Sequence, residues 1–177
     1  GIGFSHFISL GEHADVDFGD LLDWLASDAR TRAILLYIES IEAPRKFMSA
    51  ARAAARNKPV LVVKTGRSAQ GERAAASHTG ALAGADAAYE SAFEKSGVLR
   101  AVSAEELFEW SRALAWLPLP TGRRMAVLTN AGGPGVMSAD FIETHGMSLA
   151  ELSAETKEKL RAILPPAASL INPVDML

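Results

Sequence analysis

Two short, nearly continuous apolar runs constrain the fold of this chain more than any other feature. They are AILLYIE, residues 33–39, and PVLVVKTG, residues 59–66. Runs of this length without polar alternation are typical of parallel strands that helices cover on both faces. Between the runs, Phe47, Met48 and Ala51 recur at helical spacing, which predicts an amphipathic helix. The pattern predicts an α/β fold with a doubly wound parallel sheet.

The rest of the first 117 residues continues this alternation of strands and helices. The expected elements are a strand over residues 4–11, a helix over 19–27, a helix over 85–96 that stops at Gly97, a strand over 98–102, and a helix that Ser103 and Glu106 open as a capping box. Trp24, Trp110 and Trp116 lie on or beside the apolar faces of these helices. We expect all three to contribute to the core.

The segment LPLPTGRR, residues 117–124, is the one plausible linker, because two prolines and a glycine interrupt the rhythm. We expect a first domain over residues 1–117 and the start of a second over 122–177. The second unit is expected to contain strands over residues 124–130 and 147–152 and helices that follow each of them. So small a sheet buries little surface, which favours a unit that belongs to a longer polypeptide.

Charge and composition exclude several classes of function. The formal net charge is −3, with acidic and basic residues interspersed, which argues against nucleic acid or an anionic membrane as a partner. The chain has no cysteine and no apolar run of membrane-spanning length, which fits a soluble cytoplasmic protein. His13, Asp15 and Asp17 stand close together, but aspartates just before a helix are more simply caps, so we predict no metal site.

His78 is the first candidate for chemistry. It lies in SHTGALAG, residues 77–84, inside a connection of about 19 residues that is mostly Ala, Gly and Ser. Ordinary connections between strand and helix have about 2–6 residues, and longer ones are usually functional or disordered. Two interpretations stay open. His78 is either a solvated loop residue or a neutral imidazole that acts as a nucleophile.

Glu39 ends the first apolar run, so it should lie at the same carboxyl edge of the sheet as the strand that leads to His78. A carboxylate there could orient the imidazole through its second ring nitrogen. The alternative is a solvated strand end.

The segment TNAGGPGV, residues 129–136, combines a strand, a glycine turn and a helix with Pro134 in its first turn. Backbone N–H groups and the helix dipole at such a turn attract anions such as phosphate. The segment lacks the spacing of the dinucleotide and P-loop motifs. It is either a phosphate site or only a tight turn.

Taken together, several segments in this order resemble the NDP-forming acyl-CoA synthetases, which are relatives of succinyl-CoA synthetase. These segments are GFSHFISLG, ILLYIE, NKPVLVVKTGRS, AAASHTGALAG, TNAGGPGV and INPVD. The combination of SHTGALAG with a later TNAGGPG is more specific than either segment alone. Details of GFSHFISLG and ARNKPVLVVK also resemble the subgroup that is fused to a protein lysine acetyltransferase domain.

The resemblance implies flavodoxin-like ligase domains and a set of roles for named residues. His78 matches the histidine that becomes phosphorylated, Glu39 the glutamate that holds its imidazole, and Gly132, Gly133 and Gly135 the glycine turn that faces the phosphate. The implied reaction converts acyl-CoA, ADP and phosphate reversibly into a carboxylate, CoA and ATP through a phosphohistidine. No tightly bound cofactor is implied, and Mg²⁺ is expected at a nucleotide domain outside this chain.

The resemblance also implies partners that this chain does not contain. A CoA-binding domain and an ATP-grasp domain are expected on the same polypeptide or on a partner subunit, and an oligomer is an open option. A different class of function is a non-catalytic module that senses acyl-CoA and regulates a fused lysine acetyltransferase. A flavodoxin-like scaffold without a ligand is a third interpretation. Retention of His78 favours the ligase.

Overall fold

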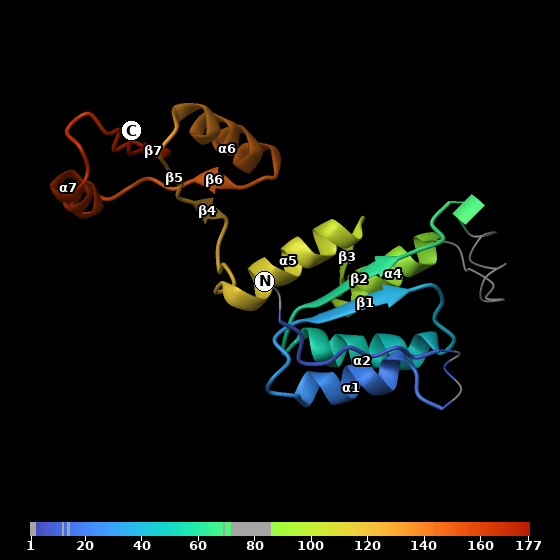
Figure 1. The fold of residues 1–177 in the computed structure, drawn as a ribbon. Helices are drawn as coiled ribbons and strands as arrows, with labels where there is room; N and C mark the ends of the chain where they lie inside the picture. Colours follow the sequence, from blue (N-terminus) through green and yellow to red (C-terminus); the bar gives the residue numbers. More distant parts are fainter. Residues whose placement is uncertain (1–2, 12, 14, 69, 72–85) are drawn as a thin grey trace. The chain divides into compact units, whose positions relative to one another are not determined.

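The computed structural model describes residues 3–11, 13, 15–68, 70–71 and 86–177. It divides the chain into two compact units, residues 1–118 and residues 119–177, which Figure 1 shows with their helices and strands labelled. Each unit is described by itself.

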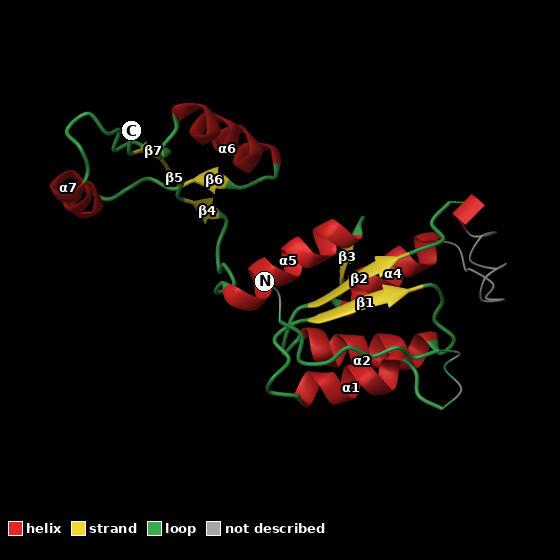
Figure 2. Ribbon diagram, in the orientation of Figure 1, coloured by secondary structure: helices red, strands yellow, loops and turns green. Residues whose placement is uncertain are grey.

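The first unit alternates helices and strands around a parallel sheet (Figure 2). Its sheet has the strand order β1-β2-β3, and both pairings are parallel. The elements are α1 (Phe18–Ser27), β1 (Ile34–Ile38), α2 (Pro44–Ala55), β2 (Val60–Lys64), α4 (Asp86–Ser96), β3 (Leu99–Ala101) and α5 (Ala104–Trp116). This arrangement confirms the predicted α/β fold with helices on both faces of a parallel sheet.

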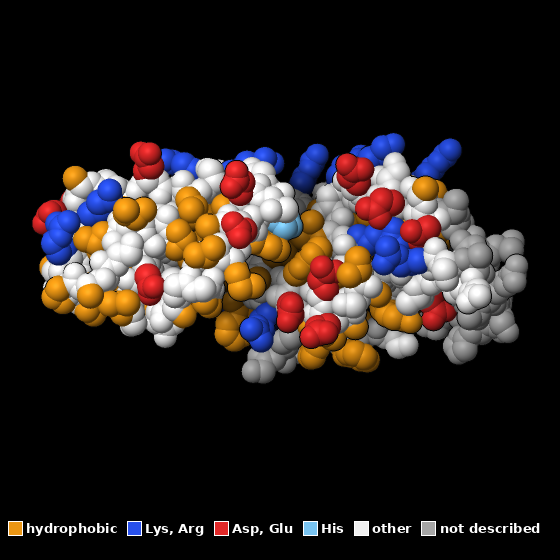
Figure 3. All heavy atoms as spheres, turned by 90° about the horizontal axis from the view of Figure 1, so that it is seen from above, with side chains coloured by type: hydrophobic (Ala, Val, Ile, Leu, Met, Phe, Trp, Pro, Cys, Tyr) orange, Lys and Arg blue, Asp and Glu red, His pale blue; other side chains and the backbone are white. Residues whose placement is uncertain are grey.

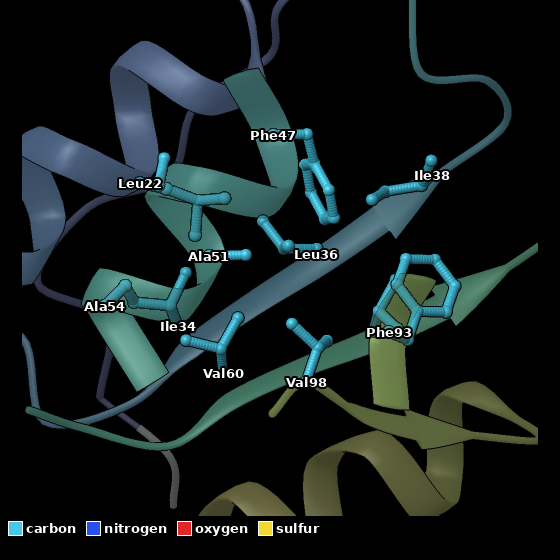
Figure 4. Close-up of a cluster of buried hydrophobic side chains, with 12 residues drawn as sticks. Leu22, Ile34, Leu36, Ile38, Phe47, Ala51, Ala54, Val60, Phe93 and Val98 are labelled. Carbon is cyan, nitrogen blue, oxygen red and sulfur yellow. The ribbon is translucent and has the colours of Figure 1, made fainter. Parts of the chain in front are cut away.

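The two faces of the sheet take alternate residues of each strand, as the strand repeat requires. Val60 and Val62 of β2 point to the main core, which lies under α1, α2 and α4 and which Figure 4 shows in close-up. Leu61 and Val63 point to the opposite face, where they join a smaller cluster with Leu107 of α5. A strand that is buried on both faces must be apolar throughout, which explains the continuous run in the sequence.

Two helix ends follow the predicted signals, and a third follows its signal in part. Asp17 caps α1 by accepting hydrogen bonds from the backbone N–H groups of Gly19 and Asp20 at 2.8 and 3.1 Å. Gly97 ends α4 with a φ of +71°, a conformation that favours glycine. Ser103 accepts from the N–H of Glu106 at 3.1 Å, whereas the Glu106 carboxylate accepts from Val102 instead of closing a capping box on Ser103.

Residues 4–11 do not form the predicted strand, because no strand among the described residues pairs with them. Side chains hold this segment instead. His6 Nε2 lies 2.8 Å from Asp28 Oδ2, and Ser5 Oγ lies 2.9 Å from Thr31 Oγ1. The apolar residues that suggested a buried strand are largely exposed, and Phe7 is 90% exposed.

The prediction that the three tryptophans contribute to the core is wrong for this chain. Trp24 is 50% exposed, Trp110 37% and Trp116 67%. Helical periodicity located an apolar face for each of them correctly, but periodicity does not show whether another element covers that face.

The second unit contains four two-residue strands and two helices. They are β4 (Arg124–Met125), β5 (Leu128–Thr129), α6 (Gly132–Thr144), β6 (Ser148–Leu149), α7 (Ala154–Ile163) and β7 (Val174–Asp175). β4 pairs with β6 and β5 pairs with β7, each in parallel. The single strand predicted over residues 124–130 is therefore divided into two short strands that belong to different pairs.

The Asn172 side chain bridges the interruption between β4 and β5. Its Oδ1 accepts a hydrogen bond from the N–H of Val127 at 2.9 Å. Its Nδ2 donates to the carbonyl oxygens of Met125 and Ala150 at 2.8 and 2.9 Å. The amide thus connects both strand pairs, which explains how so little regular sheet holds this unit together.

Two surface properties bear on partners. On the face that Figure 3 shows, acidic and basic side chains are interspersed on each unit. Within the residues that the structure describes, every helix is too short or too polar to cross a bilayer.

Candidate functional site

Glu39 lies at the carboxyl edge of the sheet in the first unit, one residue after β1 ends at Ile38. The residue as a whole is partly exposed, but its Oε2 atom is buried and has no hydrogen-bond partner among the described residues. A buried acceptor without a donor costs free energy. Ser96 Oγ and Arg100 Nε are also buried without a hydrogen-bond partner among the described residues, and Glu39 differs from them in being an acceptor at the end of a strand. The carboxylate has the chemistry to receive an N–H group at this edge.

The neighbouring strand brings a buried cation to the same edge. Lys64 is the last residue of β2, pairs in register with Ile38 and is 2% exposed. Its Nζ donates to the carbonyl oxygen of Thr65 and lies 4.6 Å from the ring centroid of Tyr89. The carbonyl and the aromatic face both compensate for the removal of this charge from water.

An open hollow of about 500 Å³ lies where β2 ends, and the chain enters the His78 connection there. Its lining residues are Lys64, Thr65, Gly66, Arg67, Ser68, Gly71 and Asp86. His78 itself lies outside the described residues, so its predicted approach to Glu39 remains a prediction.

Helix α4 begins beside this hollow and is fixed to the sheet by Arg100 of β3. The guanidinium is 7% exposed and contacts the carboxylates of Asp86 and Glu90 at 2.5 and 2.6 Å. Burial lowers the pKa of Arg100, but the two hydrogen bonds outweigh this effect, so the net shift is upward. Arg100 therefore stays charged and holds the first turn of α4 against β3.

The glycine turn of the second unit opens α6, as predicted. The residue before the helix, Ala131, offers no side-chain cap, and Pro134 has no N–H group. Gly135 already donates to the carbonyl oxygen of Ala131 at 3.2 Å. Gly132 and Gly133 thus contribute the N–H groups that remain for an anion at the end of this helix.

The three glycines differ in the space around them. A Cβ atom at Gly135 would lie 3.1 Å from Thr129 Cγ2, so this position needs a small residue for packing. A Cβ at Gly132 would lie 3.2 Å from Asp175 Oδ2, whereas a Cβ at Gly133 would meet nothing within 4 Å. Gly133 therefore faces open space at the helix end.

The other histidines have structural explanations. His6 is partly buried and hydrogen-bonded to Asp28, as predicted. His145 is the C-cap of α6, and its Nδ1 lies 2.8 Å from the carbonyl oxygen of Phe141. His13 has a φ of 56° and lies 4.9 Å from the Phe18 ring. Across the described part of the chain, no three His, Asp or Glu side chains form a group that could hold a metal ion.

Sequence reasoning missed two residues of this region, Lys64 and the hydroxyl group of Tyr89. A lysine at the end of an otherwise apolar run was a visible signal, because a parallel strand that helices cover on both faces leaves little room for a charge. The hydroxyl of Tyr89 gave no signal, since the spacing of the helix predicts only that the ring points inward.

Comparison with known proteins agrees with this architecture. Residues 1–114 match the family model described as "Succinyl-CoA ligase like flavodoxin domain". The chain therefore belongs to the family of succinyl-CoA ligase like flavodoxin domains. The predicted flavodoxin-like fold and the resemblance stated above are confirmed at this level.

Two individual proteins are similar to nearly the whole chain. The chain is 51% identical over 176 residues to the alpha subunit of acetate-CoA ligase [ADP-forming] II of Pyrococcus furiosus, and this match covers 99% of the chain and 38% of the relative. It is 49% identical over 177 residues to acetate-CoA ligase [ADP-forming] I of Archaeoglobus fulgidus, covering 100% of the chain and 26% of the relative. The chain thus spans well under half the length of these curated relatives.

A solved structure matches the fold of most of the chain. It is the dinucleotide forming acetyl-coenzyme A synthetase 1 of Ca. Korarchaeum cryptofilum in complex with phosphate and ADP. The TM-score is 0.86 and the sequence identity 44%, and the match covers 96% of this chain and 37% of that one.

Proposed function

We propose that this chain is part of an NDP-forming acyl-CoA synthetase and carries its phosphohistidine, at His78. In the first step, phosphate displaces CoA from an acyl-CoA and gives an acyl phosphate. The imidazole then attacks the phosphorus atom, and the carboxylate leaves. Finally ADP takes the phosphoryl group from the phosphohistidine, so that ATP forms and the neutral imidazole returns. The names of the relatives, acetate-CoA ligase [ADP-forming], support this proposal. ADP forms when the same reaction runs from carboxylate, CoA and ATP toward acyl-CoA.

The buried, unpartnered Oε2 of Glu39 is the observation that carries this proposal. An imidazole that attacks phosphorus through one ring nitrogen has an N–H group on the other, and that group needs a fixed acceptor. Glu39 supplies such an acceptor at the edge of the sheet from which the His78 connection begins. The carboxylate would also stabilise the positive charge that develops on the ring during phosphoryl transfer.

The uncapped end of α6 supports a phosphate site in the second unit. In the proposed role, the N–H groups of Gly132 and Gly133 would face the phosphoryl group, while Gly135 allows the helix to pack closely on Thr129. The partial positive charge of a helix N-terminus suits a group with about two negative charges.

The remaining parts of the reaction belong to the longer protein. We propose a CoA-binding domain and an ATP-grasp domain on the same polypeptide or on a partner subunit, because the relatives are much longer than this chain. Mg²⁺ would act with the nucleotide in the ATP-grasp domain. We also propose the cytoplasm as the compartment, which the absence of cysteine from this chain fits.

Labelling of the complete protein with γ-³²P-ATP tests the proposal. We expect label that acid releases and base preserves, and we expect none in His78→Asn. A non-catalytic acyl-CoA sensor would bind acyl-CoA but take up no label. Complete, folded wild-type protein that remains unlabelled with ATP and Mg²⁺ would refute the ligase.

A further inference from the structure

Tyr89 of α4 contacts two other parts of the chain at the carboxyl edge of the sheet, the connection after β1 and the end of β2. Its hydroxyl oxygen accepts a hydrogen bond from the backbone N–H of Ile41 at 3.3 Å. Ile41 lies two residues after Glu39, on the connection from β1 to α2. The ring of Tyr89 also carries the Lys64 ammonium at 4.6 Å on one face. One side chain thus touches the Glu39 connection and the end of β2.

The ring itself has a fixed position. Tyr89 packs against the main core, and its ring centroid lies 6.0 Å from that of Phe93, which is 1% exposed. One turn earlier, the Asp86 carboxylate binds Arg100 of β3. Because α4 is held on both sides of Tyr89, the hydroxyl group is a rigid anchor for whatever binds it.

The connection is held by this hydrogen bond and by the side chain of Ile41, which packs against the main core. Helix α2 begins after Ala43 without a side-chain cap, so no capping hydrogen bond fixes the chain between Glu39 and the helix. The orientation of a carboxylate on such a connection depends on the backbone that carries it. A shift of about 1 Å in a positioning group lowers reaction rates strongly.

We propose that Tyr89 is a positioning residue for phosphoryl transfer. Its hydroxyl group fixes the backbone at Ile41 and thereby aims the Glu39 carboxylate. This inference rests on the proposed function, in which Glu39 orients the His78 imidazole. Tyr89 touches neither substrate nor phosphorus and acts through Glu39.

The variant Tyr89→Phe tests the proposal, because it removes only the hydroxyl and keeps the ring that packs on Phe93 and faces Lys64. At saturating ATP, we expect His78 phosphorylation in the complete protein to slow by about 3- to 10-fold, the factor for one neutral hydrogen bond. The ATP concentration for half-maximal rate should not change. Hydrogen exchange of the Ile41 amide should accelerate by a similar factor. The melting temperature should change little.

Tyr37→Phe is the matched control, since Tyr37 is the other tyrosine of the chain and is 62% exposed on β1. It should behave as wild type in all four measurements. A wild-type rate in Tyr89→Phe, or unchanged exchange at Ile41, would overturn the positioning role while labelled wild type still supports the ligase. Unlabelled wild type would instead remove the proposed function, and the positioning role with it.

Discussion

At the scale of single residues, Glu39 has a buried carboxylate oxygen, Oε2, that accepts no hydrogen bond from the described residues. Functional sites often keep such a local cost because the reaction uses the group.

Glu39→Gln should therefore slow His78 phosphorylation without weakening the fold. Carboxylates that orient imidazoles at metal sites contribute factors of about 10 to 100, and we expect a similar loss here. The melting temperature should stay level or rise slightly, because a neutral amide costs less to bury than a carboxylate. Quenched-flow labelling and calorimetry measure the two effects. Glu42→Gln is the control, because Glu42 is an exposed residue on the same connection. A strongly lowered melting temperature in Glu39→Gln would show that Glu39 has a structural role instead.

Asp28 determines how the first unit responds to acid. The Thr31 hydroxyl donates to its carboxylate at 2.7 Å, and this bond, together with those from His6 and Arg30, holds the pKa of Asp28 well below its usual value. A carboxyl group whose pKa falls on folding stabilises the protein above its unfolded pKa of about 3.9, and this stability disappears as the pH falls toward the folded pKa.

Asp28→Asn should remove that dependence. We expect the variant to be less stable than wild type at pH 7 and to lose less stability than wild type between about pH 4 and pH 2. Urea titrations across this range, followed by circular dichroism, measure the difference. Parallel pH profiles for the two proteins would contradict the role given to Asp28.

At the scale of elements, two glycines at the N-terminus of α6 have different predicted roles, Gly133 in phosphate binding and Gly135 in packing. Gly133→Val places its side chain in open space, so it should slow phosphorylation with little change in the melting temperature. Gly135→Val would bring Cβ within 3.1 Å of Thr129 and should lower the melting temperature of the second unit. Phosphorylation rates and thermal unfolding of both variants test this. An unchanged rate in Gly133→Val would remove the phosphate role.

The short strands of the second unit depend on the side chain of Asn172. Asn172→Leu loses three hydrogen bonds to Met125, Val127 and Ala150. We expect a destabilisation of about 1–3 kcal/mol, because the backbone groups lose their partners. Hydrogen exchange of amides in residues 119–177 measures it, with the exposed Asn57→Leu of the first unit as control. Wild-type protection in Asn172→Leu would show that the short strands hold the unit without this amide.

Elements with a buried, periodic signal were predictable, and those that depend on distant partners were not. The runs at residues 33–39 and 59–66 predicted β1 and β2 because burial on both faces leaves a mark in the sequence itself. Residues 4–11 also contain several apolar side chains, but no strand among the described residues pairs with them. Ser5, His6 and Ser9 interrupt this segment, which makes it a weaker signal than the two continuous runs. The break between β4 and β5 depends on Asn172, more than 40 residues away, so no window around the break predicts it.

The sequence likewise predicts some features of the candidate site and not others. Position at the edge of a parallel sheet follows from strand order, so the sequence predicted where Glu39 lies. The burial of its Oε2 and the bond between Tyr89 and Ile41 depend on tertiary packing, which periodicity alone does not give.

At the scale of the whole molecule, the chain joins two units whose proposed roles differ. In the proposal, the first unit would supply the nucleophile and its carboxylate, and the second would supply amide dipoles for the phosphoryl group. The proposed reaction needs both, together with domains that the relatives' greater length leaves room for.

The transfer of phosphoryl groups from phosphate to nucleotide through His78 is the central claim, and a two-stage measurement tests it most directly. The complete protein is incubated with ³²P-phosphate and an acyl-CoA, without nucleotide, and is then isolated and mixed with ADP. We predict that label appears on His78 only when acyl-CoA is present, and that ADP converts it into labelled ATP. Label that forms without acyl-CoA, stays on the protein with ADP, or persists in His78→Asn would contradict it.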